Sequence, residues 1–347
     1  MSVAQSNVQT IFADAVLFDM DGTLTDSIAA VEAAWGKVAT DIGQDPAHVI
    51  AATHGKRAVD NLAQFKPHIK AHEMDAEVQA FEESILFFAD AYHLHGPGSQ
   101  PATPASFAAP QYDSGAATPD LSAGSSLASS RASSFSASNS RRPSFASRLS
   151  SMLAMSAVPE YESAFEDPIM EDAHAEILHS ADTGKDKDNI ARHELEAWQA
   201  EAAGVDRSVR ILPGVKRMMA SIPAGRYAVA TSGAKTYAYG CMTRVGITPP
   251  PVTITADDKR LKNGKPFPDP FLLAARELGF DCARTVVFED SPSGIRAGVA
   301  SGATVIAVCT SHERSKIENC GAHYIVDDME KVHCYPEGDR LRFTIAV

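Results

Sequence analysis

The sequence lacks the features that mark disulfide-rich, zinc-binding, membrane-spanning and secreted proteins. Its five cysteines are odd in number and form no Cys-x-x-Cys pair, which favours reduced, mostly structural thiols. No apolar run is long enough to cross a membrane, and residues 1–13 lack the basic and apolar regions of a secretory signal. We therefore expect a cytoplasmic protein that does not bind membranes.

Positive charge is also scarce. The chain has 31 lysine and arginine residues against 44 aspartate and glutamate residues, for a formal net charge of −13. Nucleic acids and anionic lipids bind surfaces of positive potential, so the balance argues against general affinity for either. It does not exclude a small phosphorylated substrate. A pocket that contains basic side chains, backbone N–H groups and a metal ion can be locally positive despite the negative potential of the whole protein.

A low-complexity segment divides the chain, whose 347 residues could hold two domains or one domain with disordered parts. Between Gly96 and Pro159 the sequence is crowded with serine, alanine and proline and has few large aliphatic residues. Such a segment cannot bury enough apolar surface to offset its ordering entropy. An acidic stretch follows it, and we expect residues 96–189 to form a mostly disordered insertion.

Short apolar runs rich in β-branched residues alternate with helical patterns after this insertion. The runs are Tyr227–Ala230, Val252–Thr255, Thr285–Phe288, Thr304–Val308 and Tyr324–Val326. The alternation predicts an α/β fold with a Rossmann-like parallel sheet, to which Val16–Phe18 contributes the first strand. We expect residues 1–26 and 212–347 to form this core.

A helical region separates the first strand from the second. One stripe of a helix is formed by apolar residues that recur every three or four positions, Val78, Phe81, Ile85, Phe88 and Tyr92. Helical patterns also cover Ser27–Thr40 and Lys56–Phe65. We expect residues 27–95 and 190–211 to form an α-helical domain inserted into the core.

Two carboxylates follow the first predicted strand, in the motif Asp19-Met20-Asp21-Gly22-Thr23. In open α/β sheets, ligands bind outside the carboxyl ends of the strands, where two acids would attract a divalent cation. The simpler alternative is a strand-ending turn, because aspartate and glycine are common in turns.

Three further elements lie at or beside predicted strand ends. Thr231-Ser232-Gly233 precedes a helix, so its hydroxyl and N–H groups could bind an anion or only cap that helix. Lys265 is followed by Pro266, Pro268 and Pro270, which stiffen the backbone, although most lysines are simply solvated. Glu289 and Asp290 end an apolar strand, where they could complete a magnesium site or only face solvent.

Together, these four elements resemble the motifs of the haloacid dehalogenase superfamily. The resemblance rests on Asp19-x-Asp21-Gly22-Thr23, Thr231, Lys265 and Glu289-Asp290. It implies that the helical insertion is a cap that closes over the active site and reads the substrate's leaving group. Members that cleave carbon–halogen bonds typically lack the second aspartate, so Asp21 favours phosphoryl transfer.

In the mechanism that this resemblance implies, Asp19 attacks phosphorus and forms an aspartyl phosphate. Asp21 protonates the leaving alcohol and then accepts a proton from the attacking water. Thr231, the N–H groups that follow it, and Lys265 hold the remaining phosphoryl oxygens.

The resemblance also implies Mg²⁺ as the cofactor. Its ligands would be the Asp19 carboxylate, the Asp21 carbonyl oxygen and Asp290. Glu289 would be a further ligand or would hydrogen-bond to one of the ligands.

The predicted cap contains the turn His54-Gly55-Lys56-Arg57. We expect one of its charged side chains to reach the substrate when the cap closes. Lys56 and Arg57 could instead be solvated residues at the start of a helix, where the helix dipole slightly disfavours cations. The predicted substrate-binding residues are Ser232, Gly233, His54, Lys56 and Arg57.

From about Ala13 to Tyr92 and from Arg210 onward, the sequence is similar to fungal glycerol-phosphate and 2-deoxyglucose-6-phosphate phosphatases. Matching segments include Leu212-Pro213-Gly214 and Asn263-Gly264-Lys265-Pro266. This similarity implies a phosphatase acting on a small phosphorylated metabolite, a sugar or polyol phosphate, without choosing between them. A sugar phosphomutase and a regulatory binding protein that kept a phosphatase fold are the alternatives.

The insertion contains Arg141-Arg142-Pro143-Ser144-Phe145, a pattern that basophilic kinases favour. Phosphorylation of Ser144 would add nearly two negative charges to a locally basic segment. A serine-rich segment also produces such matches by chance.

Overall fold

The computed structural model describes residues 8–98 and 196–346. The chain divides into two units, the first comprising Met1–Ser99 and Ala202–Val347 and the second Gln100–Glu201. Most of the predicted disordered insertion, including Ser144, lies outside the described residues. The predicted division of the first unit into core and cap stays a prediction, because both parts belong to that unit.

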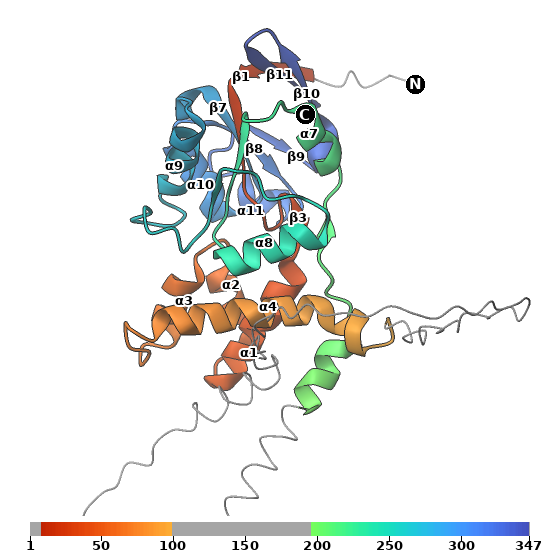
Figure 1. Cartoon of the computed structure of the whole chain (residues 1–347), viewed down its shortest axis with the longest axis vertical. Helices are drawn as coiled ribbons and strands as arrows, with labels where there is room; N and C mark the ends of the chain where they lie inside the picture. The colour runs from red at the N-terminus through yellow and green to blue at the C-terminus, as the bar shows by residue number, and fades with distance from the viewer. Residues whose placement is uncertain (1–7, 99–195, 347) are drawn as a thin grey trace, which may run out of the picture. The chain divides into compact units, whose positions relative to one another are not determined.

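A six-stranded sheet forms the centre of the first unit, with the strand order β6-β5-β2-β7-β8-β9 (Figure 1). The strands are β2 (Ala15–Phe18), β5 (Tyr227–Ala230), β6 (Thr253–Ile254), β7 (Thr285–Glu289), β8 (Thr304–Val308) and β9 (Tyr324–Val326). Every neighbouring pair is parallel. The predicted Rossmann-like α/β fold is therefore confirmed.

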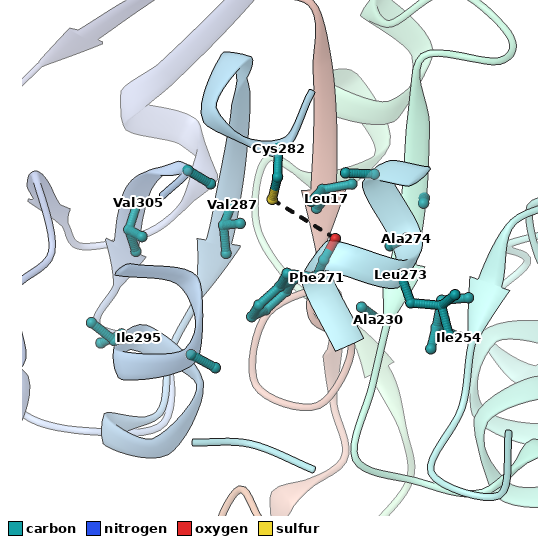
Figure 2. Packing of buried hydrophobic residues seen from close by; sticks show 14 of the residues in the cluster. Leu17, Ala230, Ile254, Phe271, Leu273, Ala274, Cys282, Val287, Ile295 and Val305 are labelled. Atoms are coloured by element: carbon teal, nitrogen blue, oxygen red, sulfur yellow. Dashed lines mark hydrogen bonds between the residues drawn. The ribbon is translucent and has the colours of Figure 1, made fainter. Parts of the chain in front are cut away.

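The central strand β2 is apolar throughout and fully buried, as expected for a parallel strand covered on both faces. Two helices, α9 (Asp269–Leu278) and α10 (Pro292–Ala300), help to bury one face of the sheet. Figure 2 shows Leu17 beside Phe271 and Val287, with Ile295 packed near Val305. The Cys282 thiol donates to the Phe271 carbonyl at 3.9 Å. Helices α7 (Val215–Ser221), α8 (Lys235–Arg244) and α11 (Arg314–Ile317) also lie among the strands in the sequence. Two 3₁₀ turns lie at Cys282–Arg284 and Met329–Lys331.

Four helices follow β2, and the sequence predicted three of them. They are α1 (Ile28–Asp41), α2 (Pro46–Thr53), α3 (Ala58–Phe65) and α4 (Met74–His95). The Trp35 and Phe81 rings pack at 4.1 Å between α1 and α4. Asp90 of α4 binds Arg244 of α8 at 2.5 Å, which ties these helices to the sheet layer (Figure 1). No helix among the described residues is both long and apolar enough to span a membrane.

Two β-structures were not predicted. The strands β1 (Val8–Ala13), β10 (Val332–Glu337) and β11 (Arg340–Ala346) form an antiparallel sheet in the order β1-β11-β10. A short ribbon pairs β3 (Thr25–Asp26) with β4 (Arg210–Ile211), where the chain enters the helices and returns from the second unit. Helix α2 was also not predicted.

The core makes a direct prediction about stability. Leu17→Ala should lower the free energy of unfolding by about 2–5 kcal/mol, because truncating a fully buried leucine leaves a cavity. Leu272→Ala is the matched control at a leucine that is 44% exposed, and should cost about 1 kcal/mol or less. Urea unfolding measures both, and equal losses would contradict this assignment of the core.

Candidate active site

Acidic and hydroxyl side chains gather at the carboxyl ends of three adjacent strands. Asp19 directly follows β2, Thr231 follows β5, and Glu289 and Asp290 lie at the end of β7. Since β5 and β7 are the two neighbours of β2, these strand ends share one edge of the sheet. The Asp19 N–H donates to the Phe288 carbonyl at 3.0 Å, which fixes the backbone there.

Lys265 places a buried ammonium group between two of these acids. Its Nζ donates to Asp19 Oδ1 and, at 2.8 Å, to Glu289 Oε1. It also lies 5.1 Å from the centroid of the Phe271 ring. Burial alone would lower the pKa of Lys265, but the charges of Asp19 and Glu289 raise it. The lysine therefore remains a positive charge, held in place by its contacts with Asp19 and Glu289.

Glu289 is held on both of its oxygens. Oε1 accepts from Lys265, and Oε2 accepts from the N–H groups of Asp290 at 2.8 Å and Ser291 at 2.7 Å. A Cβ at Gly294 would lie 1.5 Å from Oε1, so only glycine permits α10 to approach this carboxylate. These contacts favour Glu289 as the residue that positions Lys265.

Asp290 reaches the same cluster from the end of β7. Its carboxylate accepts from Thr23 Oγ1 at 3.1 Å and from Ser311 Oγ. Gly22 has a φ of +76°, and a Cβ there would lie 2.2 Å from Asp290 Oδ2. The glycine of the first motif is therefore required both by backbone conformation and by this approach. Burial raises the pKa of Asp290, and the charges of Glu289 and Asp19 add to the effect.

The cluster has the composition of a divalent-cation site. Asp19, Glu289 and Asp290 are all buried, and each offers a carboxylate oxygen within 4.8 Å of the others. Burial, together with the charges of Glu289 and Asp21, raises the pKa of Asp19 to about 7 against the opposing effect of Lys265. One ammonium cannot balance these acids, and hard divalent cations prefer carboxylate oxygens. The three residues therefore could bind a metal ion.

Asp21 lies outside this acidic triad of Asp19, Glu289 and Asp290. Its Oδ1 accepts from Ser27 Oγ and from the Tyr237 hydroxyl, each at 2.5 Å. Burial raises the pKa of Asp21, and these hydrogen bonds partly oppose the shift. Ser27 immediately precedes α1 and Tyr237 lies on α8, so neither partner is visible from the motif itself.

The segment after β5 differs from the predicted anion cradle. Thr231 Oγ1 already accepts from the Gly233 N–H at 3.0 Å. The Ser232 hydroxyl donates to the Gly55 carbonyl at 3.1 Å, which joins this segment to the turn between α2 and α3. Ala234, rather than Ser232 or Thr231, precedes the first residue of α8 and offers no side-chain cap.

One pocket lies between the strand ends and the helices α1–α4. From the sheet side it is lined by Asp19, Asp21, Ser232, Gly233, Tyr237, Glu289, Asp290, Ser291 and His312. From the helical side it is lined by Ile28, Val31, Trp35, Thr53, His54, Gly55, Lys56, Ala58, Phe81, Glu82 and Ile85. Thr231 and Lys265 are buried next to this lining rather than within it.

The predicted cap residues divide into two groups. His54 and Lys56 line the pocket, where His54 Nε2 lies 3.2 Å from Glu32 and Lys56 Nζ donates to the Ala52 carbonyl at 2.9 Å. Arg57 is not among the lining residues, and its guanidinium binds Asp60 at 2.8 Å. Helix α3 begins at Ala58, so Lys56 lies after the end of α2, where the helix dipole favours a cation.

Glu82 is a site residue that the sequence analysis did not select. It lies on α4, lines the pocket and is only 1% exposed. Burial raises the pKa of Glu82 to about 8, and the N–H group of Ala234 opposes the shift. Glu82 therefore holds its proton at neutral pH.

Comparisons with known proteins agree with this geometry. A family profile described as "Haloacid dehalogenase-like hydrolase" matches residues 142–308, a range that includes Thr231, Lys265 and the Glu289–Asp290 pair. It leaves out the motif around Asp19.

Two yeast phosphatases are similar over part of the chain. Glycerol-1-phosphate phosphohydrolase 2 of Saccharomyces cerevisiae is 34% identical over 136 residues, covering 37% of this chain and 54% of that protein. The 2-deoxyglucose-6-phosphate phosphatase 2 of the same yeast is 32% identical over 144 residues, covering 36% and 58%. The alignments thus span little more than half the length of these curated relatives.

Among solved structures, a hydrolase from Pseudomonas syringae is 15% identical, with a TM-score of 0.49 and coverage of 91% of this chain and 94% of that chain. Over part of its length, the chain is therefore similar to haloacid dehalogenase-like hydrolases and to the yeast glycerol-1-phosphate phosphohydrolases and 2-deoxyglucose-6-phosphate phosphatases.

The buried carboxyl group of Glu82 predicts a pH-dependent stability. The pKa of Glu82 rises from 4.5 to about 8 on folding, so between these values only the folded state keeps the proton. Raising the pH through this window lowers the stability of the wild type, and the full penalty is present above it. Glu82→Gln cannot ionise and should be more stable than the wild type at pH 9, on the order of a few kcal/mol.

The two proteins should be nearly equal in stability well below pH 4.5, where Glu82 of the wild type is protonated in both the folded and the unfolded state. Urea unfolding at several pH values measures the difference, with Glu83→Gln on the same helix as the control. A difference that does not change with pH would contradict a buried, protonated Glu82.

Proposed function

We propose that the chain is a Mg²⁺-dependent phosphatase that hydrolyses small sugar or polyol phosphates through an aspartyl phosphate on Asp19. The observation that carries the proposal is the buried cluster of Asp19, Lys265, Glu289 and Asp290 beside a separately held Asp21. The names of the two yeast relatives support a glycerol phosphate or a 2-deoxyglucose 6-phosphate as the kind of substrate.

Asp19 is the nucleophile in this proposal. A carboxylate oxygen attacks phosphorus, the bond from phosphorus to the alcohol oxygen breaks, and Asp19 carries the phosphoryl group as a mixed anhydride. Water then attacks phosphorus, which releases inorganic phosphate and restores the Asp19 carboxylate. Lys265 contacts Asp19 Oδ1 and stabilises the negative charge of the transferring group.

Asp21 moves the protons in both steps. In the first step it donates a proton to the leaving alcohol, and in the second it takes one from the attacking water. A pKa raised by burial suits both tasks, because the protonated form is accessible and the ionised form is a stronger base. Ser27 and Tyr237 hold the carboxylate at the pocket in one orientation.

The acidic triad would hold Mg²⁺ through Asp19 and Asp290, while Glu289 keeps its contacts with Lys265. When bound, the ion supplies positive charge that offsets the clustered acids and the phosphoryl oxygens.

The helical side of the pocket suits a small substrate with carbon–hydrogen surface. Trp35 and Phe81 pack together at 4.1 Å and both line the pocket. Aromatic and aliphatic side chains of this kind can contact the carbon backbone of a sugar or polyol, while the phosphate lies against the strand ends.

Asp19→Asn should reduce phosphate release by at least about 10³-fold, because the amide cannot form the aspartyl phosphate. Asp21→Asn should cost about 10²–10⁴-fold through lost proton transfer. Asp41→Asn, at an exposed aspartate paired with Lys37 on α1, is the control and should retain wild-type activity. A panel of sugar and polyol phosphates with Mg²⁺ provides the assay, with circular dichroism to verify folding.

The same assay separates the alternatives by product. A phosphatase releases inorganic phosphate, a phosphomutase yields an isomeric sugar phosphate, and a binding protein yields neither. Release by Asp19→Asn at the wild-type rate, or an isomer without free phosphate, would refute the proposed reaction.

Mg²⁺ should stabilise the folded protein independently of catalysis. Binding to the folded state alone contributes about 2.7 kcal/mol at a concentration 100 times the Kd. The melting temperature should therefore rise with Mg²⁺ and fall back when a chelator is added. Asp290→Asn should remove most of this rise, whereas Asp41→Asn should keep it. A Mg²⁺-induced rise that is equal in Asp290→Asn and the wild type would count against the assigned site.

A further inference from the structure

The pocket contains a buried oxygen atom that the proposed reaction does not use. Glu82 Oε1 accepts from the Ala234 N–H at 2.5 Å. Its other oxygen, Oε2, is buried and has no hydrogen-bond partner among the described residues. Among the described residues that line the pocket, no other carries such an unpaired buried side-chain atom. An unpaired buried polar atom is costly, which points to a ligand group that completes it.

Backbone N–H groups of Ala234 and Tyr237 favour the ionised form of Glu82, but the side chains around it offer little hydrogen bonding. Val31, Phe81 and Ile85 line the same side of the pocket and have no polar side-chain atoms. Other polar side chains on the helical side already contact protein groups. Thr53 donates to the Ile50 carbonyl at 3.0 Å, as Lys56 does to the Ala52 carbonyl. Oε2 of Glu82 is therefore the side-chain oxygen of this wall that lacks a hydrogen-bond partner among the described residues.

The position of Glu82 also separates it from the phosphate-binding end. It lies on α4 in the helical part, whereas Asp19 and Asp290 lie at strand ends of the sheet. A phosphate ester with its phosphorus at Asp19 would extend its alcohol portion toward the helices. A carboxyl group there can bind a hydroxyl group in either protonation state, because it donates when protonated and accepts in both forms.

We propose that Glu82 is a specificity-determining residue whose free Oε2 binds a hydroxyl group on the alcohol portion of the substrate. The enzyme would thereby select phosphate esters that carry hydroxyl groups over simple alkyl phosphates. This inference rests on the proposed phosphatase function. A site built to bind a hydroxyl rejects an analogue that lacks it, because the protein atom is then left unpaired.

Glu82 also has a structural contact that the experiment must separate from recognition. The Ala234 N–H that binds Oε1 belongs to the residue before α8, directly after Thr231-Ser232-Gly233. Loss of this contact could disturb the neighbouring strand end and slow hydrolysis of every substrate. Loss of recognition should instead slow only hydroxylated substrates.

The test compares glycerol phosphate with propyl phosphate, which has the same carbon chain without free hydroxyl groups. The wild type should have a kcat/KM at least about 10-fold higher for glycerol phosphate. Glu82→Leu should lower that value about 10- to 100-fold while changing propyl phosphate by less than about threefold. Glu82→Gln keeps an acceptor for Ala234 and a donor for the hydroxyl, so it should retain most of the preference.

Glu83→Leu, on the same helix but outside the pocket lining, is the matched control and should keep the wild-type ratio. If Glu82→Leu does not fold, Glu82→Ala replaces it, and the wild-type ratio and Glu82→Gln still test the proposal. Equal losses on both substrates, or no wild-type preference for glycerol phosphate, would overturn the inference. A wild type that hydrolyses neither ester, nor any other in a sugar and polyol panel, would refute the proposed function itself.

Discussion

The rest of the site depends on one buried ion-pair cluster, in which Lys265 lies between Asp19 and Glu289. Buried charges are tolerated only when they are paired and hydrogen-bonded. Glu289 is fixed by the N–H groups at the start of α10, and it fixes Lys265, which in turn contacts Asp19. With Asp290 added, the cluster holds more negative than positive charge. The same arrangement that orients the proposed nucleophile therefore leaves room for a cation.

The two aspartates of the first motif differ in their hydrogen-bonding partners, which the motif itself does not show. Asp19 is bound to an ammonium group and lies within the acidic triad, whereas Asp21 is bound to two hydroxyl groups, from Ser27 and Tyr237. Burial raises the pKa of both carboxyl groups, but the opposing effect comes mainly from the charge of Lys265 at Asp19 and from the two hydroxyl hydrogen bonds at Asp21. The proposed division into nucleophile and proton carrier follows from these environments.

Sequence patterns predicted the buried parallel strands well, since each is a short apolar run with clear boundaries. The bounds of β5, β8 and β9 agree with the prediction. The antiparallel sheet at the chain ends was missed because β11 buries alternate residues, a weaker pattern than a continuous run. Glu82 was missed because a glutamate on an amphipathic helix normally faces solvent. Ser27 and Tyr237 were missed because only the fold brings them to Asp21, and the predicted cytoplasmic location and the kinase site at Ser144 stay predictions.

The central claim is that the phosphoryl group passes through Asp19. Rapid mixing with a phosphate ester labelled at phosphorus, followed by an acid quench and peptide mapping, tests it most directly. The account predicts a label that forms within one turnover, is released by hydroxylamine as expected for an acyl phosphate, and lies on the peptide containing Asp19. A label on any other residue, or turnover at full rate with no labelled protein at any time within the first cycle, would contradict it.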